Sequence, residues 1–390
     1  MEFQCSLFKK AFCYLLLLLL FITFLFVYNI SVGEQKFFLL PYTSYLFQNK
    51  LFNDGKKVNT SKVNNITLIL VYTSFFGNIP WPFFTNLSCN FETLNFQISY
   101  DHNDFYKSDF VIFHSRNMPS ISELTKLRNN RNNRQLWIYF SMESIRNNPP
   151  IEDIHIFFDL VSTYALDSDI QVPYRYHERQ YKPANNKFFV EDITNRKKMI
   201  AWVVSNCHIQ ERNLLARKLL SYGVEIEVSG ACAQYYPKMF TLSSQGKPCY
   251  ADLKNFKFYF SAENGLCEDY ITEKYWETAL DNNIIPIVLG GSNYSNPRLA
   301  IPGSFIDAMS FNSPKDLANH ILDVSTNQSK YNSYFEWKKN WKLDTNSYYC
   351  SLCQKINEGF ALRQNVLINT LRSEKCSIPS AKFFSWIENS

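Results

Sequence analysis

The sequence predicts an α/β protein with two parallel sheets. Apolar strand patterns alternate with helical patterns from residue 66 to about 185, beginning with ITLILVY at 66–72. The alternation begins again with MIAWVV at 199–204, and residues 256–289 read as strand, acidic loop, helix and strand, the length of one βαβ unit. Strands that alternate with helices form parallel sheets covered by helices, so we expect two Rossmann-like halves that face a cleft.

The expected elements begin and end at recognisable residues. Leu215 and Leu219 lie on one face of a helical pattern that Gly223 would close. Ser313 as N-cap, with Pro314 at the first helical position, predicts the start of another helix. The expected strands are 66–72, 110–113, 136–140, 199–204, 224–228, 256–262 and 284–289, and the expected helices are 120–127, 210–221, one from Tyr270, and 313–324.

An apolar segment near the N-terminus predicts a membrane anchor. Residues 11–27 are almost entirely apolar and follow Lys9 and Lys10, which favours a cytosolic N-terminus. No convincing cleavage site follows, so an uncleaved type II anchor is favoured over a signal peptide. We assign 1–10 to a cytosolic tail, 11–30 to the anchor and 31–65 to a stem, with the rest lumenal. A net charge of +5 with 19% charged residues predicts no nucleic-acid partner.

Sequons and cysteines agree with a lumenal location, although N-x-[ST] triplets are common by chance in an Asn-rich chain. Eight of the ten cysteines lie beyond the anchor, which predicts several disulfides of undetermined pairing. The pair Cys350-x-x-Cys353 favours a structural disulfide role, because no second C-x-x-C would complete a zinc site. The predicted glycosylation sites are Asn59, Asn65, Asn86, Asn293 and Asn327.

Several polar residues cluster in the loop between strand 256–262 and the next helix. Glu263 and Asn264 follow the strand, and Tyr270, Glu273 and Lys274 are spaced to share one helical turn. The carboxyl ends of parallel strands bind ligands, and a carboxylate, a cation and an aromatic ring suit a nucleotide. No glycine-rich phosphate loop occurs, so Lys and Arg side chains would meet the phosphate charge. The alternative is an exposed helix with an ordinary Glu–Lys pair.

Three blocks of this region resemble the α1,3-fucosyltransferases. They are F-S-A-E-N at 260–264, D-Y-I-T-E-K at 269–274 and P-I-V-L-G at 286–290, in the family's order and spacing. The resemblance covers 136–355 well and 66–135 faintly. It implies a GT-B fold with an acceptor-side domain at 66–185, a GDP-fucose domain at 196–345, and a C-terminal tail, 346–390, that packs back on the first domain.

The resemblance also implies an activity and a location. The family inverts: L-fucose moves from GDP-β-L-fucose to O3 of a GlcNAc in N-glycans or glycoconjugates, including LacNAc and LacdiNAc units. The enzymes are Golgi type II membrane proteins that need no metal or other cofactor, with manganese at most stimulatory. The expected partners are therefore GDP-fucose, the glycan acceptor and the Golgi membrane.

Donor residues follow from the resemblance. Ser205, Asn206 and Arg212 match the family's V-S-N strand end and the arginine after it, where backbone N–H groups and a guanidinium would meet the diphosphate. The alternative is that Asn206 caps the helix and Arg212 points to water. Tyr164 begins a further family block that ends at Tyr174 and is also placed at the donor.

Acceptor-side residues follow in the same way. Glu143 stands where the family has its general base, although Ile145 replaces the usual proline, and the alternative is a helix-capping acid. His114 and Arg116 resemble an acceptor-side H-x-R element, although His114 could equally be an ordinary strand-end residue. If the tail returns to the first half as in the family, Cys89 would bond to Cys350 or Cys353.

Asp167-Ser-Asp169 leaves two rival functions open. A D-x-D holds Mn²⁺ in GT-A glycosyltransferases, which predicts a metal-dependent rival, although such motifs often mark turns. The surrounding block instead matches the fucosyltransferases, except that Ala165 and Leu166 replace two arginines. That departure motivates the third hypothesis, a catalytically silent paralogue that binds glycans.

Overall fold

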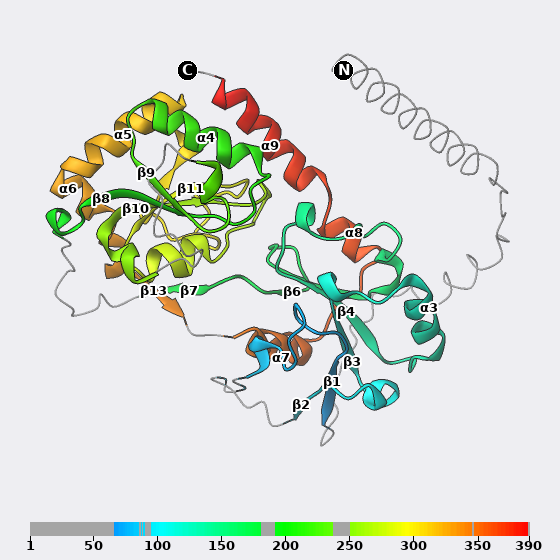
Figure 1. The fold of residues 1–390 in the computed structure, drawn as a ribbon. Helices are drawn as coiled ribbons and strands as arrows, with labels where there is room; N and C mark the ends of the chain where they lie inside the picture. Colours follow the sequence, from blue (N-terminus) through cyan, green and yellow to red (C-terminus); the bar gives the residue numbers. More distant parts are fainter. Residues whose placement is uncertain are drawn as a thin grey trace, which may run out of the picture. The chain divides into compact units, whose positions relative to one another are not determined.

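Two parallel sheets organise the chain, as the sequence predicts (Figure 1). The computed structural model describes residues 66–85, 87, 89, 95–180, 192–236, 250–344 and 347–388. Each sheet is flanked by helices, and the strand pairs within both sheets are parallel. The α/β class with two parallel-sheet halves is therefore confirmed.

The first sheet has the strand order β2-β1-β3-β4-β5-β6. Its strands read as continuous apolar runs because helices and loops cover both faces. Ile69 and Ile138 face one apolar cluster, whereas Leu70 and Trp137 face another on the opposite side. The chain reverses its direction of travel across the sheet between β1 and β3, which makes this the topological switch point. The strands are β1 Thr67–Val71, β2 Phe96–Ser99, β3 Phe110–His114, β4 Leu136–Ser141, β5 Leu160–Thr163 and β6 Ile170–Gln171.

The second sheet repeats this topology with the order β12-β11-β10-β8-β9. Its switch point lies between β8 and β10. One face packs on helices α4, α5 and α6, and the π-helix η9 packs on the other. The strands are β8 Lys198–Val203, β9 Ile226–Ser229, β10 Phe256–Ala262, β11 Ile285–Leu289 and β12 Ile306–Asp307, and a separate antiparallel pair joins β7 Tyr176–Arg179 to β13 Trp341–Asp344.

Helices α3, α4 and α5 lie close to the positions that the sequence predicts. Ser313 accepts a hydrogen bond from Asp316 N and caps α5, as its place in the sequence predicts. The helices are α3 Ile121–Asn130, α4 Gln210–Ser221, η9 Lys274–Leu280, α5 Pro314–Thr326, α6 Gln328–Ser333, α7 Tyr348–Glu358, α8 Val366–Thr370 and α9 Glu374–Ile387. Short 3-10 turns are η1 Pro82–Phe84, η2 His102–Lys107, η3 Ser115–Asn117, η4 Ile145–Asn147, η5 His155–Phe157, η6 Ile193–Asn195, η7 Ala233–Tyr235, η8 Tyr250–Asn255, η10 Ala308–Ser310 and η11 Glu336–Lys339.

The helix after β10 begins four residues later than predicted, and this expectation was wrong. Tyr270 lies in the preceding loop, and η9 begins at Lys274. The cause is Glu263, whose carboxylate accepts bonds from both the backbone N–H and the hydroxyl of Thr272. These bonds use the N–H of Thr272 outside a helix, so Tyr270, Glu273 and Lys274 do not share one helical turn.

The C-terminal segment divides between the two halves, which corrects the expectation that all of 346–390 packs on the first. Helix α7 joins the apolar cluster of the first sheet, and Val366 and Leu367 of α8 pack on its other face. Helix α9 instead lies against α4 of the second half (Figure 1). Its Phe383 and Trp386 enter the apolar cluster that contains α4 residues. The buried side chains of α9 decide this, since Phe383, Trp386 and Ile387 share the cluster of Leu215 and Leu219 from α4.

Several predictions fall outside the described residues. These are the tail at 1–10, the anchor at 11–30, the stem at 31–65, and the sequons at Asn59, Asn65 and Asn86. Within the described ranges, no helix has both the length and the apolar character needed to span a membrane.

Candidate active site

A pocket of about 750 Å³ collects residues that follow five different strands. Phe76 comes after β1, Arg116 after β3 and Glu143 after β4. Asn206 follows β8 and Asn264 follows β10, so the pocket also includes the switch point of the second sheet. Both parallel sheets therefore present their carboxyl ends, where α/β proteins bind ligands, to one cavity.

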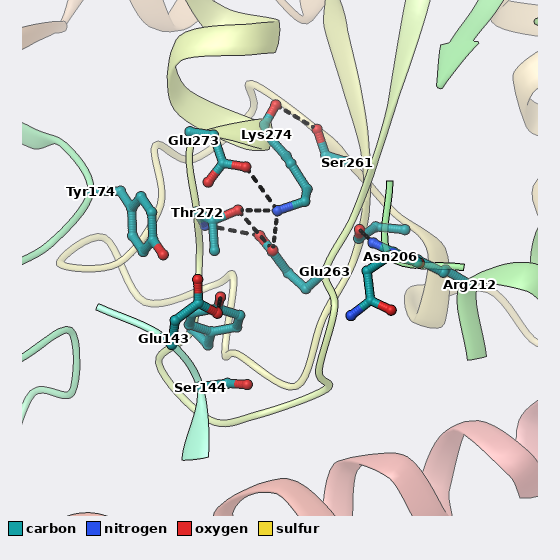
Figure 2. Close-up of polar contacts among 12 residues, drawn as sticks. Glu143, Ser144, Tyr174, Asn206, Arg212, Ser261, Glu263, Thr272, Glu273 and Lys274 are labelled. Atoms are coloured by element: carbon teal, nitrogen blue, oxygen red, sulfur yellow. Dashed lines mark hydrogen bonds and ion pairs between the residues drawn. The ribbon is translucent and has the colours of Figure 1, made fainter. Parts of the chain in front are cut away.

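A buried ionic network lies at the end of β10 (Figure 2). The Glu263 side chain is fully buried, and its two oxygens accept from Thr272 N at 2.9 Å and Thr272 Oγ1 at 2.8 Å. Lys274 Nζ lies 3.3 Å from Glu263 Oε2, donates to Thr272 Oγ1 at 2.8 Å, and pairs with Glu273 Oε1 at 3.0 Å. The network fixes the loop between β10 and η9 and holds one cation between two carboxylates.

The carboxylates keep Lys274 charged. Burial acts to lower the pKa of the Lys274 ammonium, but Glu263 and Glu273 outweigh burial, and the net pKa is raised. Burial raises the pKa of the Glu263 carboxyl, while Lys274 opposes that effect. Since 14% of the Lys274 side chain is exposed and 45% of Glu273 is, the network has an accessible edge that a polar ligand can reach.

Arg212 braces the turn after β8 rather than pointing to water. Its guanidinium is buried, donating from Nη2 to Asn206 O and from Nη1 to Ala262 O at 3.5 Å. Burial lowers the pKa of Arg212, an effect that nearby Glu263 opposes. Its Nε has no partner among the described residues. Helix α4 is capped by Ile209, so Asn206 does not act as the cap.

Two polar residues, Asn206 and Asn264, line this side of the pocket. Ser205 and Asn206 are exposed, and the Asn206 carboxamide oxygen accepts a long 3.4 Å bond from His208 N. The Oδ1 of Asn264 is buried and has no hydrogen-bond partner in the described part of the chain. Buried polar atoms are normally paired, so an unpaired amide oxygen at a pocket edge indicates a ligand position.

Glu143 and Tyr270 meet although 127 residues separate them. The Tyr270 hydroxyl lies 3.5 Å from Glu143 Oε2. The Tyr270 ring is buried and lies 4.8 Å from the ring of Tyr164 and 6.2 Å from that of Tyr174. A Cβ at Gly265 would lie only 2.9 Å from Ser144 Oγ, so the loop after β10 passes directly against the residue that follows Glu143.

The backbone around Glu143 is fixed by its own segment. Glu143 N donates to Ser141 Oγ at 3.2 Å, and Glu143 O accepts from Asn148 Nδ2 at 3.0 Å. Tyr174 donates to the carbonyl of Met142 at 2.9 Å. These bonds hold the backbone while leaving the carboxylate partly exposed at the pocket wall.

His114 and Arg116 take different places. The ring of His114 is buried, and its Nδ1 lies 3.0 Å from Asn117 Oδ1. Burial lowers the pKa of His114, which keeps the ring neutral near neutral pH. Arg116 is exposed at the pocket and donates to Asn147 O. Arg116 is thus accessible to an acceptor, whereas His114 lies beneath the pocket wall.

Asp167 and Asp169 are paired with cations of the C-terminal segment. Arg363 contacts Asp169 Oδ1 at 2.8 Å, and Asp169 Oδ2 accepts from Val161 N at 2.8 Å. Lys375 contacts Asp167 at 2.8 Å. These bonds use the carboxylates to attach the C-terminal segment to the first half, which favours a structural role over the GT-A role.

The disulfides connect distant segments. Cys89 bonds to Cys350, which is one of the two pairings that the family resemblance implies. The predicted disulfide role of Cys353 was wrong, because Cys353 is a buried free thiol. Cys267, in the loop after β10, bonds to Cys376 in α9. A third bond joins Cys207 to Cys232. Of the two described sequons, Asn293 is exposed in a turn and Asn327 caps α6 through its side chain.

Comparison with known proteins decides the family. Residues 64–175 match "Fucosyltransferase, N-terminal", and residues 193–372 match "Glycosyltransferase family 10 (fucosyltransferase) C-term". The chain belongs to glycosyltransferase family 10, the fucosyltransferases.

Two relatives illustrate the similarity of this fucosyltransferase to others. "3-galactosyl-N-acetylglucosaminide 4-alpha-L-fucosyltransferase FUT3" of Bos taurus is 30% identical over 269 residues, which cover 68% of this chain and 71% of that one. "4-galactosyl-N-acetylglucosaminide 3-alpha-L-fucosyltransferase 9" of Mus musculus is 32% identical over 302 residues, covering 75% and 78%. The structure "Crystal Structure of alpha1,3-Fucosyltransferase" aligns with a TM-score of 0.46 and 16% identity, covering 85% of this chain and 94% of that chain.

Sequence reasoning missed several residues of the candidate site. Thr272 links Glu263 to Lys274, and Tyr174 stands beside Tyr270. Arg146 pairs at 2.7 Å with Glu211, a buried acid of α4, and so ties the segment after Glu143 to the second half. The contacts of Tyr174 and Arg146 join segments that are distant along the chain, so no local pattern signals them. Thr272 lies within the D-Y-I-T-E-K block, and its role becomes visible only through its bonds with Glu263 and Lys274.

Ala165 and Leu166, which stand where the family has two arginines, make packing and backbone contacts. Ala165 is buried and donates its N–H to Thr163 Oγ1 at 3.2 Å. Leu166 N donates to Asp269 Oδ2 at 3.0 Å, and its side chain packs against the cluster that contains Ile271. In this fucosyltransferase the segment therefore forms an apolar contact with the loop after β10 instead of offering two cations.

Proposed function

We propose that this fucosyltransferase transfers L-fucose from GDP-β-L-fucose to O3 of a GlcNAc in N-glycans or glycoconjugates, with inversion at fucose C1. The observation that carries the proposal is the pocket that Glu143 of one half shares with Asn206 and Asn264 of the other. A base on one wall and nucleotide-binding groups on the opposite wall suit a single displacement. The name of the Mus musculus relative specifies a 4-galactosyl-N-acetylglucosaminide and a 3-alpha linkage, which supports O3 of a LacNAc-type acceptor. The name of the Bos taurus relative specifies a 3-galactosyl unit and a 4-alpha linkage, so the linkage is a point for the test.

The chemistry assigns one proton transfer to Glu143. The acceptor O3 attacks C1 as the bond from C1 to the diphosphate oxygen breaks, and the electron pair leaves with GDP. The Glu143 carboxylate takes the proton of the acceptor hydroxyl, which is a general-base step usually contributing about 10²–10⁴ in rate. The nearby Tyr270 hydroxyl orients the Glu143 carboxylate toward the pocket.

Stabilisation of the departing GDP is assigned to Lys274 and Arg212. Lys274 stays protonated and has an accessible edge, and Arg212 retains an unpaired Nε. Glu273 is half exposed and would accept from the ribose hydroxyls. Fixed cations at the developing negative charge give the largest electrostatic contribution to transfers of this kind. We propose that no metal is required, because Asp167 and Asp169 already pair with Lys375 and Arg363.

The proposed location is the Golgi membrane, with a type II anchor at 11–30 and the catalytic part lumenal. This rests on the apolar segment after Lys9 and Lys10 and on the even number of cysteines beyond it.

The test is transfer by the purified chain to a glycan array with GDP-fucose, with the linkage read by mass spectrometry. Fucose on O3 of GlcNAc supports the proposal, and the array separates core GlcNAc from LacNAc and LacdiNAc. Parallel reactions with EDTA test the metal-dependent alternative, which predicts complete loss of activity. Binding of GDP without any transfer would instead favour the silent paralogue motivated by Ala165 and Leu166.

A further inference from the structure

The turn after β1 has a backbone that its sequence disfavours. Phe75 and Asn78 form a two-residue hairpin, with N–H to O distances of 3.0 and 2.9 Å in the two directions. Both central residues have positive φ, 49° at Phe76 and 86° at Gly77, as in a type I′ turn. Asn, Asp or Gly normally occupies the first central position, because a bulky residue there is strained.

The strained turn is held by its surroundings. Phe76 N donates to Asn117 Oδ1 at 3.1 Å, and the same oxygen lies 3.0 Å from His114 Nδ1. The Phe76 ring packs edge-on against His114 at 4.8 Å and against Phe75 at 4.9 Å. Buried His114 therefore supports the Phe76 ring from beneath. Strain that is maintained in this way is characteristic of functional positions.

The supported ring remains largely open to solvent at the active site. Phe76 is 51% exposed and lines the pocket together with Glu143 and Arg116. It follows β1 and contacts the last residue of β3, the two strands that flank the switch point of the first sheet. An exposed aromatic ring at a switch point has the position of a ligand contact rather than of a core residue.

We propose that the Phe76 ring is a stacking surface for the sugar that is attached to the fucosylated GlcNAc, a β-galactoside ring. This inference rests on the proposed function and specifies how its acceptor is recognised. One face of a galactopyranose carries only C–H groups because O4 is axial, and such an apolar face packs well on an aromatic ring. Arg116 at the same wall supplies donors for hydroxyls at the rim of that sugar.

The test uses Phe76→Asn in the full-length chain, with Galβ1-4GlcNAc and free GlcNAc as acceptor probes. Asn favours the first position of a type I′ turn, so the variant should unfold at a higher temperature than the wild type. Its KM for the disaccharide should rise about tenfold with kcat nearly unchanged, and its KM for GlcNAc should stay near the wild-type value. Phe76→Tyr should restore the wild-type KM.

Ile79→Asn is the matched control. Ile79 lies on the same loop and is 57% exposed, but it is not among the described residues that line the pocket. This variant should leave the KM for the disaccharide unchanged. An unchanged disaccharide KM in a folded Phe76→Asn variant would overturn the inference, as would an equal rise for both acceptors.

Saturation-transfer NMR with the disaccharide and GDP measures the contact between galactose and the protein without any fucose transfer. Wild-type protein should saturate the galactose H3, H4 and H5 protons, and Phe76→Asn should abolish this signal. Absence of disaccharide binding to the wild type, or an unchanged signal in the variant, would overturn the inference. Failure of the proposed function can be told apart from failure of this inference, because wild-type protein would then transfer fucose to neither probe.

Discussion

Replacing Lys274 with Ala should destabilise the second half as well as weaken donor binding. The substitution removes the cation from a carboxylate, Glu263, whose side chain is fully buried. Two neutral donors from Thr272 would remain on the Glu263 oxygens. Breaking a buried ion pair on one side costs about 3–5 kcal/mol, and we expect the low end of that range, about 3 kcal/mol, because both Thr272 bonds persist.

The stability lost in the Lys274→Ala variant should increase as the pH rises. Without Lys274, burial would raise the pKa of Glu263 in the folded protein above its value in the unfolded chain. A group of this kind binds more protons when folded, so its contribution to stability is present at low pH and is lost as the pH rises. The difference between Lys274→Ala and the wild type should therefore be larger at about pH 7 than at about pH 5.

Thermal unfolding and calorimetric titration of GDP on the same samples separate the two effects. Glu263→Gln combined with Lys274→Ala removes both charges, so it should recover most of the lost melting temperature. The double variant should still bind GDP more weakly, since one charge-assisted contact contributes about 1.5–3 kcal/mol. Wild-type stability of Lys274→Ala at neutral pH, or a greater loss at acidic pH, would refute the reasoning; wild-type GDP affinity would remove Lys274 from the donor site.

Three further outcomes are expected. Glu143→Gln should lower the single-turnover rate by about 10²–10⁴ while GDP affinity stays the same, and a stable, fully active variant would contradict the proposed mechanism. Burial raises the pKa of the Cys353 thiol to about 12, so thiol reagents near neutral pH should label it only after denaturation; rapid labelling of native protein would be the contrary result. Non-reducing peptide mapping should recover the Cys89–Cys350 bond, and Cys89→Ser should reduce secretion of a fragment that lacks residues 1–30, since losing such a bond costs about 2–5 kcal/mol; a Cys350–Cys353 peptide would speak against it.

Strands and most helices could be predicted because their signals are local. The apolar run that becomes β11, Ile285–Leu289, is recognisable within its own few residues, and Ser313 with Pro314 marks the start of α5. The start of η9 could not be predicted. It depends on Glu263 binding the backbone of Thr272, and residue spacing carries no information about that bond.

The candidate site was predictable only in part. The three blocks at 260–290 were sufficient to indicate the family, and the placement of Asn206, Asn264 and Glu143 around one pocket agrees with the positions that the resemblance gave them. His114 was expected beside the acceptor, but it is buried beneath Phe76. Periodicity places a residue at a strand end and does not determine which neighbour will cover it.

The sequence by itself determined the α/β class, the two parallel halves and the family, because these depend on patterns within short segments. Only the tertiary structure decided that Tyr270 meets Glu143, that Cys89 bonds to Cys350, and that α9 packs on the second half. Each of these joins residues that are more than a hundred positions apart or packs one amphipathic face on another. Such pairings are selected by the free energy of burying the whole apolar surface together, and no local pattern specifies the partner.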